Sequence, residues 1–125
     1  MHQEKDLREL VIKTARSMNA LGINVNKSGN VSVRARVGEL EGFWITPTGI
    51  AYEDLVAQDI VFVALDGLPH EEFAKQRKAS SEWLMHAEVY RHRQDVSAIV
   101  HTHSAYATAL ACQDLCIPAF HYMVA

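Results

Sequence analysis

Residues 98–111 read AIVHTHSAYATALA, a stretch in which an apolar run ends on two histidines and a segment of small residues follows. The run VSAIV (96–100) predicts a strand, and SAYATALACQ (104–113) predicts a short helix with Ser104 as its N-cap. If the strand continues to His103, the side chains of His101 and His103 lie on one face, because alternate residues of a strand point the same way. The stretch therefore predicts a strand-to-helix connection that carries two imidazoles side by side.

Working outward from this stretch, strands and helices alternate along the chain, which predicts one α/β domain over residues 1–125. Apolar residues at helical spacing predict a first helix near 5–21, and SSEWLMHAEVYRHR (80–93) predicts another, with Ser81 as N-cap and Glu82 in its first turn. Three segments predict strands: VSVRAR (31–36), FWIT (43–46) and IVFVAL (60–65). The last is a continuous β-branched run, so we expect it to be buried on both faces.

Composition narrows the class of protein further. Hydrophobic residues make up 49% of the chain, which is too many for a disordered protein, and the net charge is −3. Without a basic excess, we expect no nucleic acid or anionic membrane as partner. No segment has the pattern of a signal peptide or a membrane span, so we expect a cytoplasmic protein. Cys112 and Cys116 fit no metal motif, and we expect both to be reduced thiols in the core.

Two neutral imidazoles on one face are a ready pair of metal ligands, although such a pair also arises by chance. A catalytic zinc site usually has three protein ligands and one open position. The other histidines offer no spacing that marks an obvious third ligand; they are His2, His70, His86, His92 and His121.

Three short polar segments are each ambiguous alone: SGNVS (28–32), TPTG (46–49) and SSE (80–82). Their backbone N–H groups, the Asn30 amide and the paired serine hydroxyls could hold a phosphate. Taken alone, SGNVS is explained better by a tight turn and SSE by a helix cap, and TPTG is ambiguous. Glu82 could complement a helix dipole, or act as a general base if it lies near a metal.

Together, GNVSVR, TPTGI, SSEW, HTH and IPAFHYM, in this order, resemble the class II aldolase/adducin family, most closely its branch that cleaves L-fuculose 1-phosphate. The resemblance extends from about Leu7 to the end of the chain. It implies a three-layer α/β/α fold with a mainly antiparallel central sheet. It also implies a homotetramer with active sites between subunits.

The resemblance further implies a role for each matching residue. His101 and His103 correspond to the first two of three zinc-binding histidines, and Glu82 to the base that takes a proton from the nucleophilic carbon. Tyr122 corresponds to the proton donor on the aldehyde side. The residues that correspond to the phosphate site are Gly29, Asn30, Thr48, Gly49, Ser80 and Ser81.

The implied reaction is cleavage of a short ketose 1-phosphate into dihydroxyacetone phosphate and an aldehyde, in which Zn²⁺ neutralises the charge of the enediolate. Two other activities of the family stay open, a pentulose-phosphate 4-epimerase and a methylthioribulose-phosphate dehydratase. A non-catalytic, adducin-like binding module is the alternative from another class.

In the family, the third zinc-binding histidine follows the HYM motif, whereas this sequence ends at Ala125. We therefore expect a family domain that is incomplete at its C-terminal end. His121 does not match the third ligand by position, and a Glu82 oxygen is the alternative third donor. On this interpretation the 125-residue chain alone binds zinc weakly and has little aldolase activity.

Overall fold

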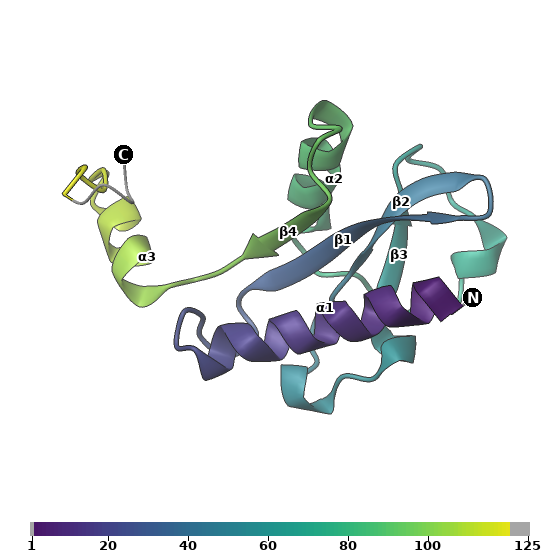
Figure 1. The fold of residues 1–125 in the computed structure, drawn as a ribbon, viewed down its shortest axis with the longest axis horizontal. Helices are drawn as coiled ribbons and strands as arrows, with labels where there is room; N and C mark the ends of the chain where they lie inside the picture. Colours follow the sequence, from purple (N-terminus) through teal and green to yellow (C-terminus); the bar gives the residue numbers. More distant parts are fainter. Residues whose placement is uncertain (1, 121–125) are drawn as a thin grey trace.

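The computed structural model describes residues 2–120, in which a four-stranded sheet lies between helices (Figure 1). Tyr122 and His121 lie outside this range, so their expected roles stay predictions. The helices are α1 (His2–Ala20), α2 (Trp83–His92) and α3 (Ala105–Cys112), with 3₁₀ turns at Tyr52–Asp54, Ala57–Asp59 and Glu71–Phe73. The strands are β1 (Asn30–Val37), β2 (Leu40–Ile45), β3 (Val61–Ala64) and β4 (Ala98–His101).

The strand order is β3-β2-β1-β4, and every neighbouring pair is antiparallel. β1 and β2 form a hairpin whose turn contains Gly38 with φ +57°, a conformation that glycine adopts without strain. On its other side β1 pairs with β4, which comes more than 60 residues later in the chain. The register of that pair sets Asn30 opposite His101, so the topology brings together two residues that are 71 positions apart in the sequence.

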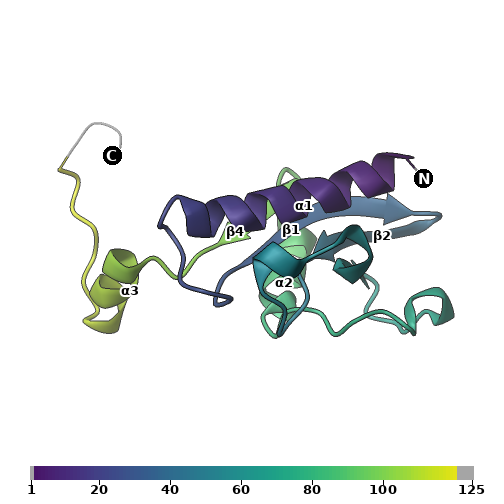
Figure 2. The same cartoon turned by 90° about the horizontal axis from the view of Figure 1, so that it is seen from below.

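Two hydrophobic cores cover the two faces of the sheet, as alternation along the strands requires. On one face α1 packs against Val31, Trp44 and Phe62. On the other face, two residues of α2, Ala87 and Tyr90, pack against Phe43, Ile45 and Val61. Figure 2 shows α1 and α2 on opposite sides of the strands. The expected α/β/α layering and antiparallel sheet are confirmed.

The expectation for IVFVAL holds only in part. Val61 and Phe62 are buried and point into opposite cores, but Val63 and Ala64 are only half-buried. The reason is topological, since β3 lies at the edge of the sheet and has one neighbour rather than two.

Two local predictions are wrong. Ser81 is exposed and does not cap α2; Glu82 holds the N-cap position, and the Glu82 N–H points to the Ser80 hydroxyl at 3.4 Å. Cys112 and Cys116 are both free but exposed, because α3 lies away from the sheet instead of packing on it (Figure 1). Ser104 does occupy the N-cap position of α3, without a capping hydrogen bond from its side chain. Over residues 2–120 no helix has the length and apolar character that crossing a bilayer demands.

Arg34 on β1 ties α2 and the start of β4 to the centre of the sheet. Its guanidinium donates to the carbonyl oxygens of Val96 (3.0 Å), Tyr90 (2.8 Å) and Arg93 (3.0 Å), and it lies over the ring of Tyr90. Three carbonyl acceptors in different directions suit the fork of donors on an arginine and not the single ammonium of a lysine. Arg34 therefore fixes the segment that leads from α2 into β4.

We predict that Arg34→Lys lowers the free energy of unfolding by about 2 kcal/mol, because two part-buried charged hydrogen bonds to backbone carbonyls are lost. Arg36→Lys, on the same strand, is the matched control, since Arg36 makes only an exposed ion pair with Glu41 and should lose less than about 0.5 kcal/mol. Urea unfolding of both variants checks this. Equal losses would contradict the anchoring role.

Candidate metal centre and active site

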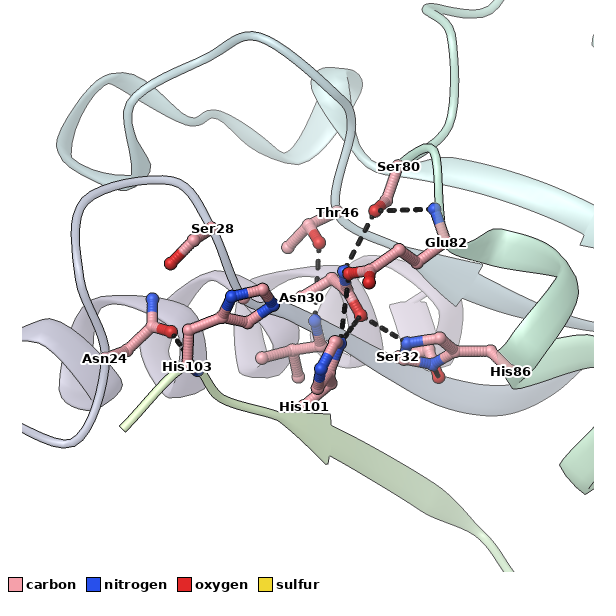
Figure 3. A network of polar contacts seen from close by, with 12 residues as sticks. Asn24, Ser28, Asn30, Ser32, Thr46, Ser80, Glu82, His86, His101 and His103 are labelled. Carbon is pink, nitrogen blue, oxygen red and sulfur yellow. Dashed lines mark hydrogen bonds and ion pairs between the residues drawn. The ribbon is translucent and has the colours of Figure 1, made fainter. Parts of the chain in front are cut away.

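The polar residues of the candidate site come from four segments that meet at one end of the sheet (Figure 3). Asn30 begins β1, Thr46 follows β2, and His101 ends β4. The fourth segment, Ser80 to Glu82, directly precedes α2. Residues far apart in the sequence are therefore adjacent here because the strand register places their ends together.

Glu82, His101 and His103 each offer one ligand atom, and these atoms lie within 4.8 Å of one another. The Nδ1 atom of His101 is 3.0 Å from Oε2 of Glu82, and the centroids of the two imidazole rings are 4.8 Å apart. β4 itself ends at His101, yet the rings of both histidines converge, as the HTH pattern predicts. Two imidazole nitrogens and a carboxylate oxygen are a set of donors that holds zinc in proteins.

The Nε2 atom of His103 is buried and has no hydrogen-bond partner among the described residues. A buried polar atom without a partner is costly, and an imidazole nitrogen in this state is suited to a metal. This atom and the chemistry of the three donors are the observations that fit a metal ion.

Asn24 fixes the backbone of His103. Its Oδ1 accepts the His103 backbone N–H at 2.9 Å, and its Nδ2 donates to Oδ1 of Asn19 at 3.1 Å. The loop after α1 thus positions a candidate metal ligand 79 residues away. Asn24 was not predicted as a site residue, because no motif in the sequence marks it.

Gly29 lies at a crowded point of the chain. A Cβ atom at this position would be 2.4 Å from the carbonyl oxygen of His101 and 2.6 Å from Oδ1 of Asn24. Only glycine lets β4 approach so closely. The Tyr52 hydroxyl donates to the Gly29 carbonyl; burial, and then the charge of Glu82, raise the pKa of Tyr52 to about 12, so this hydroxyl stays a donor.

The side-chain amide of Asn30 is buried and fully engaged. Its Nδ2 donates to Oε2 of Glu82 at 2.7 Å and to the hydroxyl of Ser80 at 3.0 Å. Its Oδ1 contacts Nδ1 of His101 at 3.3 Å and also Nε2 of His86 (Figure 3). Asn30 is therefore the residue that links the metal donors to the protein interior.

His86 is completely buried behind this site. Burial, and then the nearby His101, lower the pKa of His86 to about 4, against a smaller opposite effect of Glu82, so the ring is neutral at pH 7. The sequence analysis did not single out His86. Its position four residues after Glu82, on the same helical face, is the signal that could have found it.

The expected phosphate segments TPTG and SSE lie side by side. Pro47 and Ala79 form a β-bridge. The backbone N–H of Thr48 donates to the carbonyl oxygen of Lys78, and the backbone N–H of Ser80 donates to the carbonyl oxygen of Thr46. Ser80 is buried against Asn30, whereas Thr48, Gly49 and Ser81 are exposed. The hydroxyls of Thr48 and Ser81 have no hydrogen-bond partner within residues 2–120, so both are open to an anion.

Comparison with known proteins gives a family match over most of the chain. Residues 9–125 match the family model described as "Class II Aldolase and Adducin N-terminal domain". Among solved structures, one titled "L-fuculose 1-phosphate aldolase" superimposes with a TM-score of 0.82 and 36% sequence identity, covering 94% of this chain and 53% of that chain.

Curated relatives are similar over nearly the whole sequence. The 5-methylthioribulose-1-phosphate/5-deoxyribulose-1-phosphate aldolase of Rhodospirillum rubrum is 46% identical over 119 residues, 95% of this chain and 50% of its own. The L-fuculose phosphate aldolase of Escherichia coli strain K12 is 42% identical over 123 residues, 98% of this chain and 54% of its own. The chain spans about half the length of the curated relatives it matches.

The buried His86 predicts a specific dependence of stability on pH. Its pKa is near 6.5 in the unfolded chain and about 4 in the folded chain, so between these values the unfolded state binds more protons. The contribution of neutral His86 to the free energy of unfolding is fully present above pH 6.5. It decreases as the pH falls toward 4, by about 3 kcal/mol at most. His86→Gln should lose less stability than the unmodified protein over this window.

Denaturant unfolding at pH 7 and pH 4 measures the difference. His92→Gln is the matched control, because His92 is exposed on the same helix, and it should keep the original pH dependence. Parallel curves for all three proteins would contradict the prediction.

Proposed function

The chain belongs to the class II aldolase and adducin family, and we propose that the protein is a zinc-dependent aldolase that cleaves a short ketose 1-phosphate into dihydroxyacetone phosphate and an aldehyde. One observation carries the proposal: Glu82, His101 and His103 converge, and the buried Nε2 of His103 lacks a protein partner. The names of the relatives support the substrate class.

In this proposal His101, His103 and Glu82 hold the metal ion. When bound, zinc supplies a Lewis acid that stabilises negative charge on the substrate oxygens. The residues fit that ion through two nitrogen donors and one oxygen donor.

Glu82 transfers the proton in the proposed reaction. During cleavage Tyr122, assigned from the family resemblance, takes the proton of the C4 hydroxyl. The C3–C4 bond then breaks to release the aldehyde, and its electron pair passes into the C2 carbonyl to give an enediolate. Glu82, in its protonated form, delivers a proton to C3, which completes dihydroxyacetone phosphate. In the reverse direction Glu82 removes that proton, and Tyr122 returns its proton to the aldehyde oxygen, which becomes the C4 hydroxyl.

The phosphate is proposed to bind where TPTG and SSE adjoin. Thr48, Gly49 and Ser81 are exposed and offer two hydroxyls and a backbone N–H. Ser80 precedes Ser81 and accepts from the side chain of Asn30, the residue that follows Gly29. A grip on the phosphate supplies binding energy away from the reacting carbons. From the family resemblance we also propose a cytoplasmic homotetramer.

The relatives' names favour two substrate groups within this class, L-fuculose 1-phosphate and 5-substituted ribulose 1-phosphates. Both carry the same phosphate-bearing three carbons, which the proposed site contacts. They differ only in the aldehyde part.

The test uses the protein expressed from its complete coding sequence, with Zn²⁺. We expect release of dihydroxyacetone phosphate from at least one of L-fuculose 1-phosphate, 5-deoxyribulose 1-phosphate and 5-methylthioribulose 1-phosphate. Glu82→Gln should lower kcat about a hundredfold or more, because the proton carrier is lost. Glu88→Gln is the matched control on α2, since Glu88 pairs with Arg91 at the surface, and it should keep full activity.

Thr48→Ala combined with Ser81→Ala should raise KM more than it lowers kcat. Epimerisation or dehydration without release of dihydroxyacetone phosphate would contradict the aldolase, and a fully active Glu82→Gln variant would contradict the role of Glu82.

A further inference from the structure

A continuous chain of buried polar contacts runs from α2 to the candidate active site. Tyr90 OH lies 2.7 Å from the Ser32 hydroxyl, which lies 2.7 Å from Nδ1 of His86. The Nε2 atom of His86 contacts Oδ1 of Asn30, and Nδ2 of Asn30 donates to Glu82 at 2.7 Å. Apart from Glu82, every member of this chain is almost completely buried, at most 1% exposed.

The charge of Glu82 decides the direction of these hydrogen bonds. An ionised carboxylate only accepts, so the NH₂ end of the Asn30 amide must face it. The carbonyl end, Oδ1, must then face His86. Because Oδ1 also only accepts, Nε2 of His86 must carry the ring proton.

The remaining contacts follow from this tautomer. A neutral ring protonated at Nε2 has a lone pair at Nδ1, which accepts the Ser32 hydroxyl proton. The Ser32 oxygen then accepts from Tyr90. In this direction all five groups are satisfied; with the opposite tautomer, Nε2 and Oδ1 would face each other as two acceptors in a buried site.

We propose that His86 is a positioning residue: by donating from Nε2 to Asn30, it turns the Asn30 NH₂ group toward Glu82 and fixes the position of that carboxylate beside His101 and His103. A neighbour that orients a ligand or base in this way typically affects metal affinity or activity about 10–100-fold. The inference rests on the proposed function only in taking Glu82 as a member of the metal site.

The proposal gives the side chain of Asn30 a role of its own. Both hydrogens of its amide are committed, one to Ser80 and one to Glu82. Its side chain therefore orients Glu82, and the phosphate contact expected of Asn30 stays a prediction.

The first test is a spectroscopic signature that a purely structural histidine need not show. Long-range ¹H–¹⁵N correlation spectra of the ¹⁵N-labelled protein at pH 7, without added metal, distinguish the two neutral tautomers. The signal that disappears in His86→Gln identifies His86. We expect protonated Nε2 and unprotonated Nδ1. The Nδ1-protonated tautomer, or a mixture, would overturn the proposal.

The second test measures affinity for Zn²⁺ alone, by competition with a chromophoric chelator. His86→Phe keeps a ring to stack on Phe43 but has no donor, and it should weaken binding about 10–100-fold. His86→Gln places an amide N–H near the position of Nε2 and should remain within about threefold of the original affinity. Ile45→Val is the control for lost packing, because Ile45 is fully buried in the same core cluster as Phe43. This variant should bind zinc normally.

The proposal would be overturned if His86→Phe and Ile45→Val bound Zn²⁺ with equal affinity. It would also be overturned if His86→Gln bound Zn²⁺ as weakly as His86→Phe. If His86→Phe does not fold, the tautomer and the Gln variant still decide it. Neither test uses a sugar phosphate, so a protein that cleaves no ketose 1-phosphate would contradict the proposed function while these results judge His86 separately.

Discussion

The site depends on one close contact, the antiparallel pairing of β1 with β4 where Asn30 faces His101. Within residues 2–120, β1 is the first strand and β4 the last. Their pairing succeeds because Gly29 has no side chain to collide with the His101 carbonyl. From this contact the rest follows: His101 lies beside Asn30, His103 reaches Asn24, and both rings converge on Glu82.

Behind the candidate metal donors lies a polar core rather than an apolar one. This core contains three buried polar residues that form a continuous chain of hydrogen bonds, from Ser32 to His86 to Asn30. Buried polar groups are tolerated only because each has its partner. A network of this kind holds a carboxylate in one place more rigidly than apolar packing could, since each bond has a direction. We infer that precision at Glu82 is the reason why polar groups occupy this core.

The sequence predicted the strands and the convergence of His101 with His103, because hydrophobic alternation and i, i+2 spacing are local signals. The α/β/α layering came from the family resemblance and not from these patterns. It missed His86, Asn24 and Ser32 because their partners lie 54 to 79 residues away and no periodicity reveals a buried polar contact. It misjudged Cys112 and Cys116 because helical spacing does not tell whether a helix packs on the sheet. Ser81 failed as a cap because the turn before α2 places Glu82 there.

The most direct measurement of the central claim is the zinc affinity of Gly29→Ala compared with Gly42→Ala. Both glycines are crowded: a Cβ at Gly42 would be 2.3 Å from the Val63 carbonyl, where β2 pairs with β3. Both variants should lose stability. If the contact of Gly29 with β4 builds the site, only Gly29→Ala weakens zinc binding by folded protein, about tenfold or more. Unchanged affinity in folded Gly29→Ala would contradict the account.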